Sequence, residues 1–200
     1  MLTKILSCLA VIFFITACQN DKSTDSTKPD DHPDTTAAAV WVAHDTIRKN
    51  GISVAMAEKK GGLMGQVKIS MSDDKSQKAA KKNFAYDGIF HGAHLYDLNN
   101  DGKMEVYIFN SSEGTGSYGD IIAYQYDQGK MDSIRVDNSQ LMSDTGYMGH
   151  DSIYINPPYL YRQYPVYHEE DPNCCPTGGK RRIKYKLTTV KGKLTLIPLK

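Results

Sequence analysis

Residues 97–126 read DLNNDGKMEVYIFNSSEGTGSYGDIIAYQY, and they contain two stretches in which apolar side chains recur at every second position. The first stretch places Met104, Val106 and Ile108 in this pattern, and the second repeats it from Ile122. A period of two is typical of β-strands, because successive side chains of a strand point to opposite faces of the sheet. The glycine-rich segment between the two stretches then predicts an antiparallel hairpin.

The same period recurs elsewhere between residues 40 and 200. Examples are ISVAM at 52–56, VKISM at 67–71 and RIKYKL at 182–187. Clusters of Gly, Asn, Asp and Pro separate these short stretches, and about 160 residues are enough for one domain with a sizeable core. We therefore predict a single all-β domain over residues 40–200, an antiparallel β-sandwich or barrel-like sheet of about eight strands.

One segment of this domain, residues 72–83, departs from the strand pattern. Asp73 and Asp74 precede a run of lysines that begins at Lys75. This order of charges complements the dipole of an α-helix, because carboxylates favour its first turn and cations its last. We expect a short helix or a solvated loop here.

The N-terminal residues indicate export. Lys4 supplies a positive charge, and the apolar run that follows it is too short to cross a bilayer as a helix. The sequence ITAC then resembles the lipobox of bacterial lipoproteins, in which the chain is cut before the cysteine and the new terminus is acylated. We predict a signal peptide at residues 1–17, a lipidated Cys18 and a flexible polar tether up to residue 39.

The charge balance argues against a nucleic-acid partner. The chain has 24 basic and 23 acidic residues, and loss of Lys4 with the signal peptide leaves 23 of each sign. Without a net positive charge, the mature chain lacks the long-range field that attracts polyanions. We expect it to contact the membrane through the lipid anchor only.

The acidic turn at residues 97–102, DLNNDG, places oxygen-bearing side chains at alternate positions, Asp97, Asn99 and Asp101, and a glycine at the sixth. Calcium-binding loops use this arrangement, and Glu105 is the next carboxylate along the chain. The twelfth position, a bidentate glutamate in the EF-hand, holds no carboxylate here, so water or other loops would complete the ligand set. Two interpretations stay open, a calcium site at these four residues or a hairpin turn stabilised by Asx side chains.

Residues 114–119, GTGSYG, match the spacing GxGxxG of dinucleotide-binding loops. That fingerprint requires a helix after the loop, whereas a second alternating stretch follows here, so we reject the match. A catalytic triad of Ser117 with His150 and Asp151 is also disfavoured, because neighbouring residues of a strand point to opposite faces. We therefore predict no catalytic residue, and we expect the protein not to be an enzyme.

Two further pairs carry reactive side chains. His91 and His94 are three residues apart, a spacing that splits them across a sheet and disfavours shared metal ligation. Cys174 and Cys175 are adjacent, and they are the only thiols left once the signal peptide is removed and Cys18 is acylated. A vicinal disulfide, a disulfide between two chains and free thiols all remain open for this pair.

Five blocks, taken in order, resemble the periplasmic inhibitors of invertebrate-type lysozyme. They are DLNNDGKMEVYIF, GTGSYGDIIAYQY, GYMGHDSIYI, LYRQYPVY and PTGGKRRIKYKL, and they lie between residues 84 and 187. The resemblance implies an antiparallel β fold, often dimeric, that presents a Ser-Gly-x-Tyr loop to the cleft of the lysozyme. The matching residues here are Thr115, Gly116, Ser117 and Tyr118, with threonine in place of the leading serine.

The resemblance implies a lysozyme inhibitor that protects peptidoglycan from a host or environmental lysozyme. Together with the lipobox, it leads us to expect a lipid-anchored protein in the envelope of a Gram-negative bacterium, at the outer membrane, with the domain facing the periplasm or exposed at the cell surface. Such an inhibitor requires no cofactor. The residues leave one alternative open, a calcium-stabilised β module of the envelope that binds a glycan or a protein.

Overall fold

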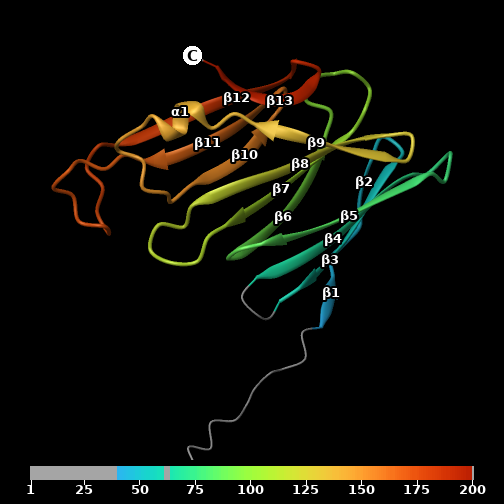
Figure 1. The fold of residues 1–200 in the computed structure, drawn as a ribbon, viewed down its shortest axis with the longest axis horizontal. Helices are drawn as coiled ribbons and strands as arrows, with labels where there is room; N and C mark the ends of the chain where they lie inside the picture. The colour runs from blue at the N-terminus through green and yellow to red at the C-terminus, as the bar shows by residue number, and fades with distance from the viewer. Residues whose placement is uncertain (1–39, 61–63, 200) are drawn as a thin grey trace, which may run out of the picture. The chain divides into compact units, whose positions relative to one another are not determined.

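A computed structural model of the chain describes residues 40–60 and 64–199. The predicted signal peptide, the predicted lipidation site Cys18 and the predicted tether lie outside the described residues. The described part contains thirteen β-strands and one short helix, and its strands form two sheets (Figure 1). None of these residues belongs to a helix with the length and hydropathy of a membrane span.

The first sheet has five strands, in the order β1-β3-β4-β5, and β2 pairs with β3 beside this path. All of its neighbouring strands are antiparallel. Its strands are β1 (Trp41–Ala43), β2 (Ile47–Lys49), β3 (Ile52–Lys59), β4 (Gly65–Asp73) and β5 (Ala79–Tyr86). The long strands β3 and β4 carry the apolar face that packs against the second sheet.

The second sheet has eight strands, in the order β10-β11-β12-β13-β9-β8-β7-β6. Its elements are β6 (Ile89–Tyr96), β7 (Glu105–Ser111), β8 (Gly119–Asp127), β9 (Lys130–Val136), β10 (Ser152–Asn156), β11 (Tyr159–Pro165), β12 (Lys180–Val190) and β13 (Lys193–Leu199), with helix α1 (Ser139–Met142) between β9 and β10 in the chain. The pair of β13 with β9 is parallel, and the other pairs are antiparallel. The sheet curls, so its two halves share one core (Figure 1).

Two apolar clusters meet at β7. Val106 and Ile108 belong to the cluster between the two sheets, whereas Tyr107 and Phe109 belong to the cluster enclosed by the curled sheet. All seven residues of β7 are buried, because the strand has core on both faces. The glycine-rich loop therefore follows the most completely buried strand described here.

The all-β prediction is confirmed, since the five-stranded sheet packs against a curled eight-stranded sheet. The described strands outnumber the eight that we expected. Strands β1 and β2 have only three residues each, which is too short for a period of two to be visible. Strand β5 is mostly exposed, and its sequence AAKKNFAY shows no alternation of apolar and polar residues.

At residues 72–83, where we expected a short helix or a loop, the chain forms the end of β4, a turn and the start of β5. The helix is wrong for a local reason. The carboxylate of Asp73 accepts the N–H of Lys75 at 2.8 Å, so it stabilises a turn rather than the start of a helix. After the turn, Ala80 and Phe84 pack on the core between the sheets, and the lysines among them remain exposed.

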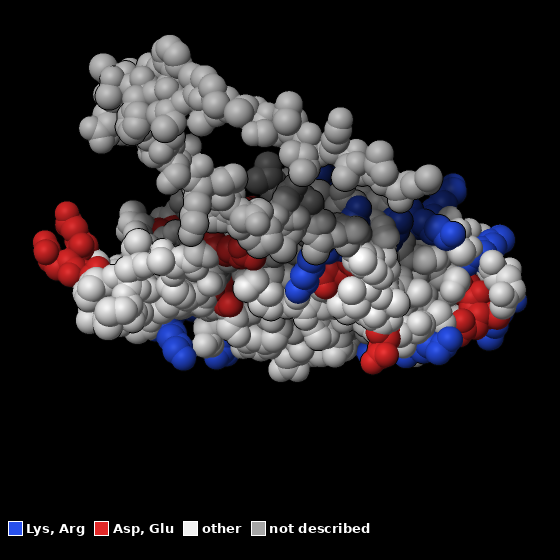
Figure 2. Space-filling model, turned by 90° about the horizontal axis from the view of Figure 1, so that it is seen from below, with Lys and Arg blue, Asp and Glu red and all other residues white. Residues whose placement is uncertain are grey.

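The described surface includes a disulfide and a mixture of charged side chains. Cys174 and Cys175 form a vicinal disulfide on an exposed loop between β11 and β12, one of the three states that the sequence left open. On the face drawn in Figure 2, Lys and Arg side chains are interspersed with Asp and Glu side chains. This mixture agrees with the balanced totals of 24 basic and 23 acidic residues.

Candidate functional site

The glycine-rich loop joins β7 to β8 and is closed at its base. The N–H of Ser112 donates to the carbonyl oxygen of Tyr118 at 2.9 Å, and the N–H of Tyr118 donates to the hydroxyl of Ser112 at 3.0 Å. Beyond this pair, Thr115 is exposed and Ser117 is half-buried, while Tyr118 itself is 46% exposed. The loop therefore carries two hydroxyls and one phenol ring at the surface.

The backbone of this loop depends on its glycines. Gly114 has a φ of +109°, a conformation that L side chains rarely adopt. A Cβ at position 116 would collide with the ring of Tyr118, because the ring lies beside Gly116. Ser117 follows with a φ of 41°, in the left-handed region. The direction of the Tyr118 ring is thus set by packing on its own loop.

The segment that precedes β10 braces the loop from the other side. The N–H of His150 donates to the carbonyl oxygen of Gly116 at 2.5 Å. Gly149 has a φ of +86°, and a Cβ there would collide with the same carbonyl oxygen. The ring of Tyr147 contacts the ring of Tyr118 edge-on, with centroids 5.6 Å apart. Segments GTGSYG and GYMGHD, which belong to two of the five blocks that carry the resemblance, are therefore in direct contact.

Asp151 links the loop to this brace. Its Oδ2 accepts the N–H of Gly119 at 2.7 Å and the hydroxyl of Tyr147 at 2.5 Å. Burial and the hydrogen bond to Asp151 raise the pKa of Tyr147, so the phenol remains a donor. Because Gly119 is the first residue of β8, Asp151 holds the end of the loop at which the chain returns to the sheet.

The carboxylate of Asp151 is buried, and Arg162 on β11 faces it. The side chains of Arg162 and Asp151 are 2% and 0% exposed, and Arg162 Nε lies 3.9 Å from Asp151 Oδ1. Neither of these two atoms has a hydrogen-bond partner among the described residues. Since an isolated buried charge is costly, each charge stabilises the other. Sequence reasoning missed this pair, and it considered Asp151 only as a member of a catalytic triad.

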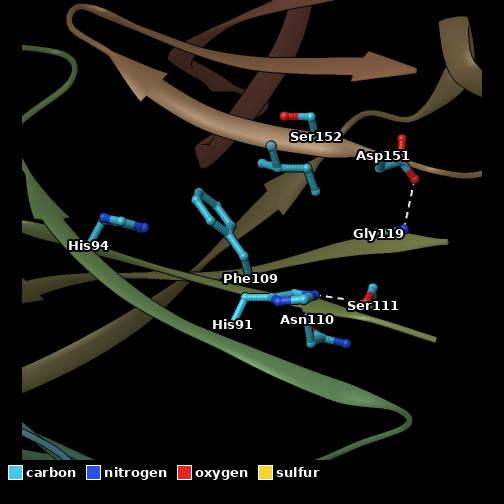
Figure 3. Close-up of a pocket in the computed structure, with 9 residues that line it drawn as sticks. His91, His94, Phe109, Asn110, Ser111, Gly119, Asp151 and Ser152 are labelled. Carbon is cyan, nitrogen blue, oxygen red and sulfur yellow. Dashed lines mark hydrogen bonds between the residues drawn. The ribbon is translucent and has the colours of Figure 1, made fainter. Parts of the chain in front are cut away.

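A cavity of about 330 Å³ lies beside the start of β8, the strand that follows the loop (Figure 3). Gly119 and Asp151 line it, as do the side chains of His91 and His94 on β6. Our expectation that the two histidines lie on opposite faces of a sheet is wrong. The pairing of β6 with β7 shifts by one residue after Phe90, and this β-bulge lets both imidazoles line one cavity.

The two histidines have different surroundings in this cavity. His91 Nε2 is within hydrogen-bonding distance of the Ser111 hydroxyl, at 2.8 Å. Burial lowers the pKa of His94, which favours its neutral form. Neither histidine belongs to a group of three metal-ligating side chains within the described part of the chain.

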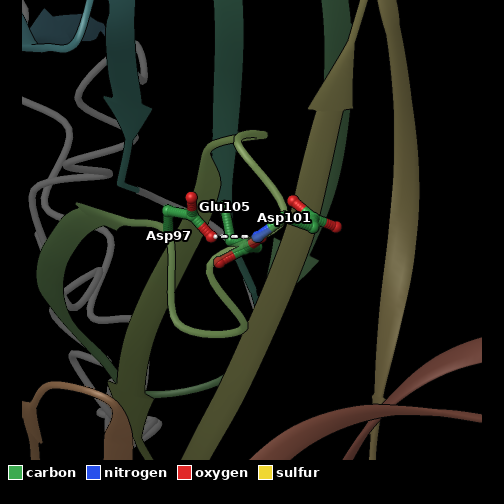
Figure 4. A group of neighbouring side chains, drawn as sticks. All are labelled: Asp97, Asp101 and Glu105. Carbon is green, nitrogen blue, oxygen red and sulfur yellow. Dashed lines mark hydrogen bonds between the residues drawn. The ribbon is translucent and has the colours of Figure 1, made fainter.

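The acidic turn lies at the end of β7 opposite the loop, and Figure 4 shows its three carboxylate side chains close together. Asp97, Asp101 and Glu105 bring carboxylate oxygens within 4.8 Å of one another, the one such group of three among the residues that the structure describes. Asn99, the fourth predicted ligand, instead donates its side-chain amide to Asp101 at 2.9 Å. Its oxygen accepts the N–H of Asp101 at 3.3 Å.

Hydrogen bonds hold these carboxylates in place. Asp97 accepts the N–H groups of Asp101 at 3.1 Å and Gly102 at 2.9 Å, as in an Asx-stabilised turn. Glu105 is fully buried and accepts the N–H of Leu98 at 2.8 Å. Burial raises the pKa of Glu105 to about 7. The arrangement satisfies the turn by itself, and its hard oxygen donors also suit a divalent cation.

No protein-family model, curated protein or solved structure matches the chain. The lysozyme-inhibitor resemblance therefore rests on the five sequence blocks alone. The structure adds the geometry in which residues 115–118 are displayed.

Proposed function

We propose that this protein inhibits lysozyme, most simply the invertebrate type, by inserting residues 115–118 into the active-site cleft. The observation that supports the proposal is the loop itself, which is exposed at its tip and braced behind by Tyr147, Gly149 and the Asp151–Arg162 pair. A loop that is already held in one conformation loses little conformational entropy on binding. Protein inhibitors of enzymes commonly bind with little change of backbone at the interface.

The chemistry of the loop suits the floor of a glycosidase cleft. Retaining glycosidases have two carboxyl groups about 5 to 5.5 Å apart. The hydroxyls of Thr115 and Ser117 can donate to such carboxylates, and each charge-assisted hydrogen bond contributes about 1.5 to 3 kcal/mol. The ring of Tyr118 would occupy a sugar subsite as an aromatic anchor. Occupation of the cleft is sufficient for inhibition, so the inhibitor needs neither a catalytic residue nor a cofactor.

The proposal includes a setting for the inhibitor. Acylation at Cys18 would anchor it in the envelope of a Gram-negative bacterium, at the outer membrane and facing the periplasm or the surface. The predicted tether up to residue 39 would connect this anchor to the domain. The partner is a host or environmental lysozyme, and a homodimer is consistent with the resembling family.

Inhibition assays with invertebrate-, chicken- and goose-type lysozymes test this proposal. We expect the parent chain to inhibit at least the invertebrate enzyme. Thr115→Ala removes a hydroxyl and should weaken inhibition by about tenfold, whereas Thr115→Ser keeps the hydroxyl and should remain within about twofold of the parent. If the parent inhibits none of the three enzymes, the function is wrong. If Thr115→Ala and Tyr118→Ala both inhibit as well as the parent, the loop assignment is wrong.

A second candidate is the calcium-stabilised binding module of the envelope. The cluster of Asp97, Asp101 and Glu105 favours it, because three carboxylates within 4.8 Å are a suitable donor set for calcium. Titration calorimetry with CaCl₂ on the parent and on Asp101→Asn tests the site directly. Lysozyme inhibition that persists in chelator supports the first candidate. Binding to a glycan that is lost in chelator supports the second.

A further inference from the structure

The outer face of β10, β11 and β12 carries aromatic and basic side chains that the loop does not use. Ile153, Leu160, Ile183 and Tyr185 point into the core of the curled sheet, so their neighbours along these strands point outward. The outward residues include three tyrosines and three cations, Tyr154, Tyr159, Tyr161, Arg182, Lys184 and Lys186. We refer to these six residues as the tyrosine–lysine face.

The tyrosines of this face are organised by contacts with one another. Tyr154 pairs with Tyr161, and Tyr161 pairs with Lys184, so the three side chains form a row across three strands. The rings of Tyr154 and Tyr161 stack with centroids 5.3 Å apart and planes 12° apart. The ring of Tyr159 lies 6.4 Å from that of Tyr161, and Lys184 Nζ sits 3.7 Å from the Tyr159 centroid. The row is therefore preformed.

The cations of this face recur at a regular interval and have no acidic neighbours in the sheet. Arg182, Lys184 and Lys186 are alternate residues of β12, so their positions repeat about every 6.8 Å. The Arg182 guanidinium donates to Gln163 Oε1 at 3.1 Å, a contact that keeps it on the face. The four strands from β10 to β13 contain no Asp or Glu. A chain with balanced charge overall thus has one locally basic face.

We propose that the tyrosine–lysine face binds an acidic polysaccharide. Carboxylates or phosphates repeated along a sugar chain would pair with the three cations. The phenol hydroxyls of the three partly exposed tyrosines would exchange hydrogen bonds with sugar hydroxyls. The three cations and the three phenols together require a ligand that carries repeated anionic groups and sugar hydroxyls. A polysaccharide meets this requirement, so the ligand is a chain rather than a single sugar.

The contacts within the face favour a glycan over the two other common anionic partners. Single-stranded nucleic acid binds through bases stacked on free aromatic faces. Here one face of the Tyr161 ring is stacked on Tyr154 and one face of the Tyr159 ring is covered by Lys184, which reduces the aromatic surface on which bases could stack. Stable binding to a lipid surface combines cations with apolar side chains that insert among acyl chains, and the six residues of this face include no aliphatic side chain.

Binding of four labelled probes to the purified chain tests the proposal. The probes are an oligogalacturonate with one carboxylate per sugar, a neutral malto-oligosaccharide of the same length, an oligodeoxythymidylate and phosphatidylglycerol vesicles. We expect the oligogalacturonate to bind tightest, with an affinity that falls as salt is raised. Tyr161→Ala and Lys184→Gln should each weaken it by about tenfold. Lys130→Gln replaces an exposed lysine of β9 outside this face, so it is the matched control for Lys184→Gln and should leave binding unchanged.

Several results would overturn the proposal. They are absence of oligogalacturonate binding, equal or tighter binding of the oligodeoxythymidylate or of phosphatidylglycerol vesicles, and an affinity that neither substitution changes. Lys184→Gln removes only the ammonium group of a partly exposed side chain, so it remains informative if Tyr161→Ala fails to fold. The lysozyme assay on residues 115–118 is independent, and its failure and the failure of glycan binding are therefore distinguishable.

Discussion

Replacing Arg162 by methionine tests how the loop is supported. Methionine is unbranched, fills a similar volume and has no charge, so Arg162→Met leaves the carboxylate of Asp151 buried without a cation. The two side chains are at most 2% exposed, and Nε lies 3.9 Å from Oδ1. Two unit charges at this separation interact by about 4 kcal/mol at an effective dielectric constant of about 20.

We expect Arg162→Met to lower the free energy of unfolding by about 3 to 5 kcal/mol, because breaking a buried ion pair costs more than breaking an exposed one. Urea denaturation at pH 7 measures this loss, which is a large fraction of the total stability of about 5 to 15 kcal/mol typical of a domain. The double variant Arg162→Met with Asp151→Asn removes both charges. Its loss of unfolding free energy should be about 2 kcal/mol smaller than the sum of the losses of the two single variants.

The reasoning is refuted if Arg162→Met loses less than about 1 kcal/mol, within the range of an exposed ion pair. It is also refuted if the double variant loses the sum of the two single losses within about 0.5 kcal/mol. Either result would mean that Asp151 and Arg162 do not stabilise each other as charges. The carboxylate would then hold Gly119 for reasons unrelated to the pair.

The remaining predictions concern the brace, the acidic turn and the anchor. Gly149→Ala should destabilise the fold by about 1 to 3 kcal/mol and weaken inhibition, because its Cβ meets the Gly116 carbonyl. Gly192 also has a positive φ but no atom within 4 Å of an added Cβ, so Gly192→Ala should leave inhibition unchanged. The pKa of Glu105 is about 7 when folded against an ordinary 4.5, so folding takes up a proton. Stability from this group is therefore fully present below pH 4.5 and lost as pH rises through 7, by at most about 3 kcal/mol. Glu105→Gln should flatten that slope in urea denaturation, and an unchanged slope would assign it to another group. Cys18→Ser should abolish labelling by fatty acid and move the protein from the membrane fraction to the soluble fraction, and continued labelling would contradict the lipobox prediction.

The fold class could be predicted from the sequence because alternation is strong wherever a strand has a core on one face. Val67, Ile69 and Met71 show this clearly on β4, and all three are buried. Alternation fails where strands are exposed or only three residues long. The helix prediction at residues 72–83 was wrong because the same Asp73 carboxylate can stabilise the start of a helix or a turn. The continuation of β4 into this segment decides for the turn.

The candidate site could be predicted in part. Thr115 to Tyr118 are consecutive, so any fold brings them together, and the acidic turn is local in the same way. The brace is not local, because Gly119 and Asp151 are 32 residues apart and no short pattern connects them. One signal for the buried Asp151–Arg162 pair was available in the sequence. Arg162 occupies a position of β11 at which the residues two before and two after it are apolar and buried, so its side chain points to the same face as theirs.

The central claim, that the exposed loop occupies a lysozyme cleft, is tested most directly by the inhibition constant of Tyr118→Ala against invertebrate-type lysozyme. An aromatic anchor worth about 2 kcal/mol predicts an increase of about 30-fold in that constant. Tyr161→Ala removes a tyrosine from a different face and should stay within about twofold of the parent. An inhibition constant for Tyr118→Ala equal to that of the parent would contradict the account, as would a parent chain that does not inhibit.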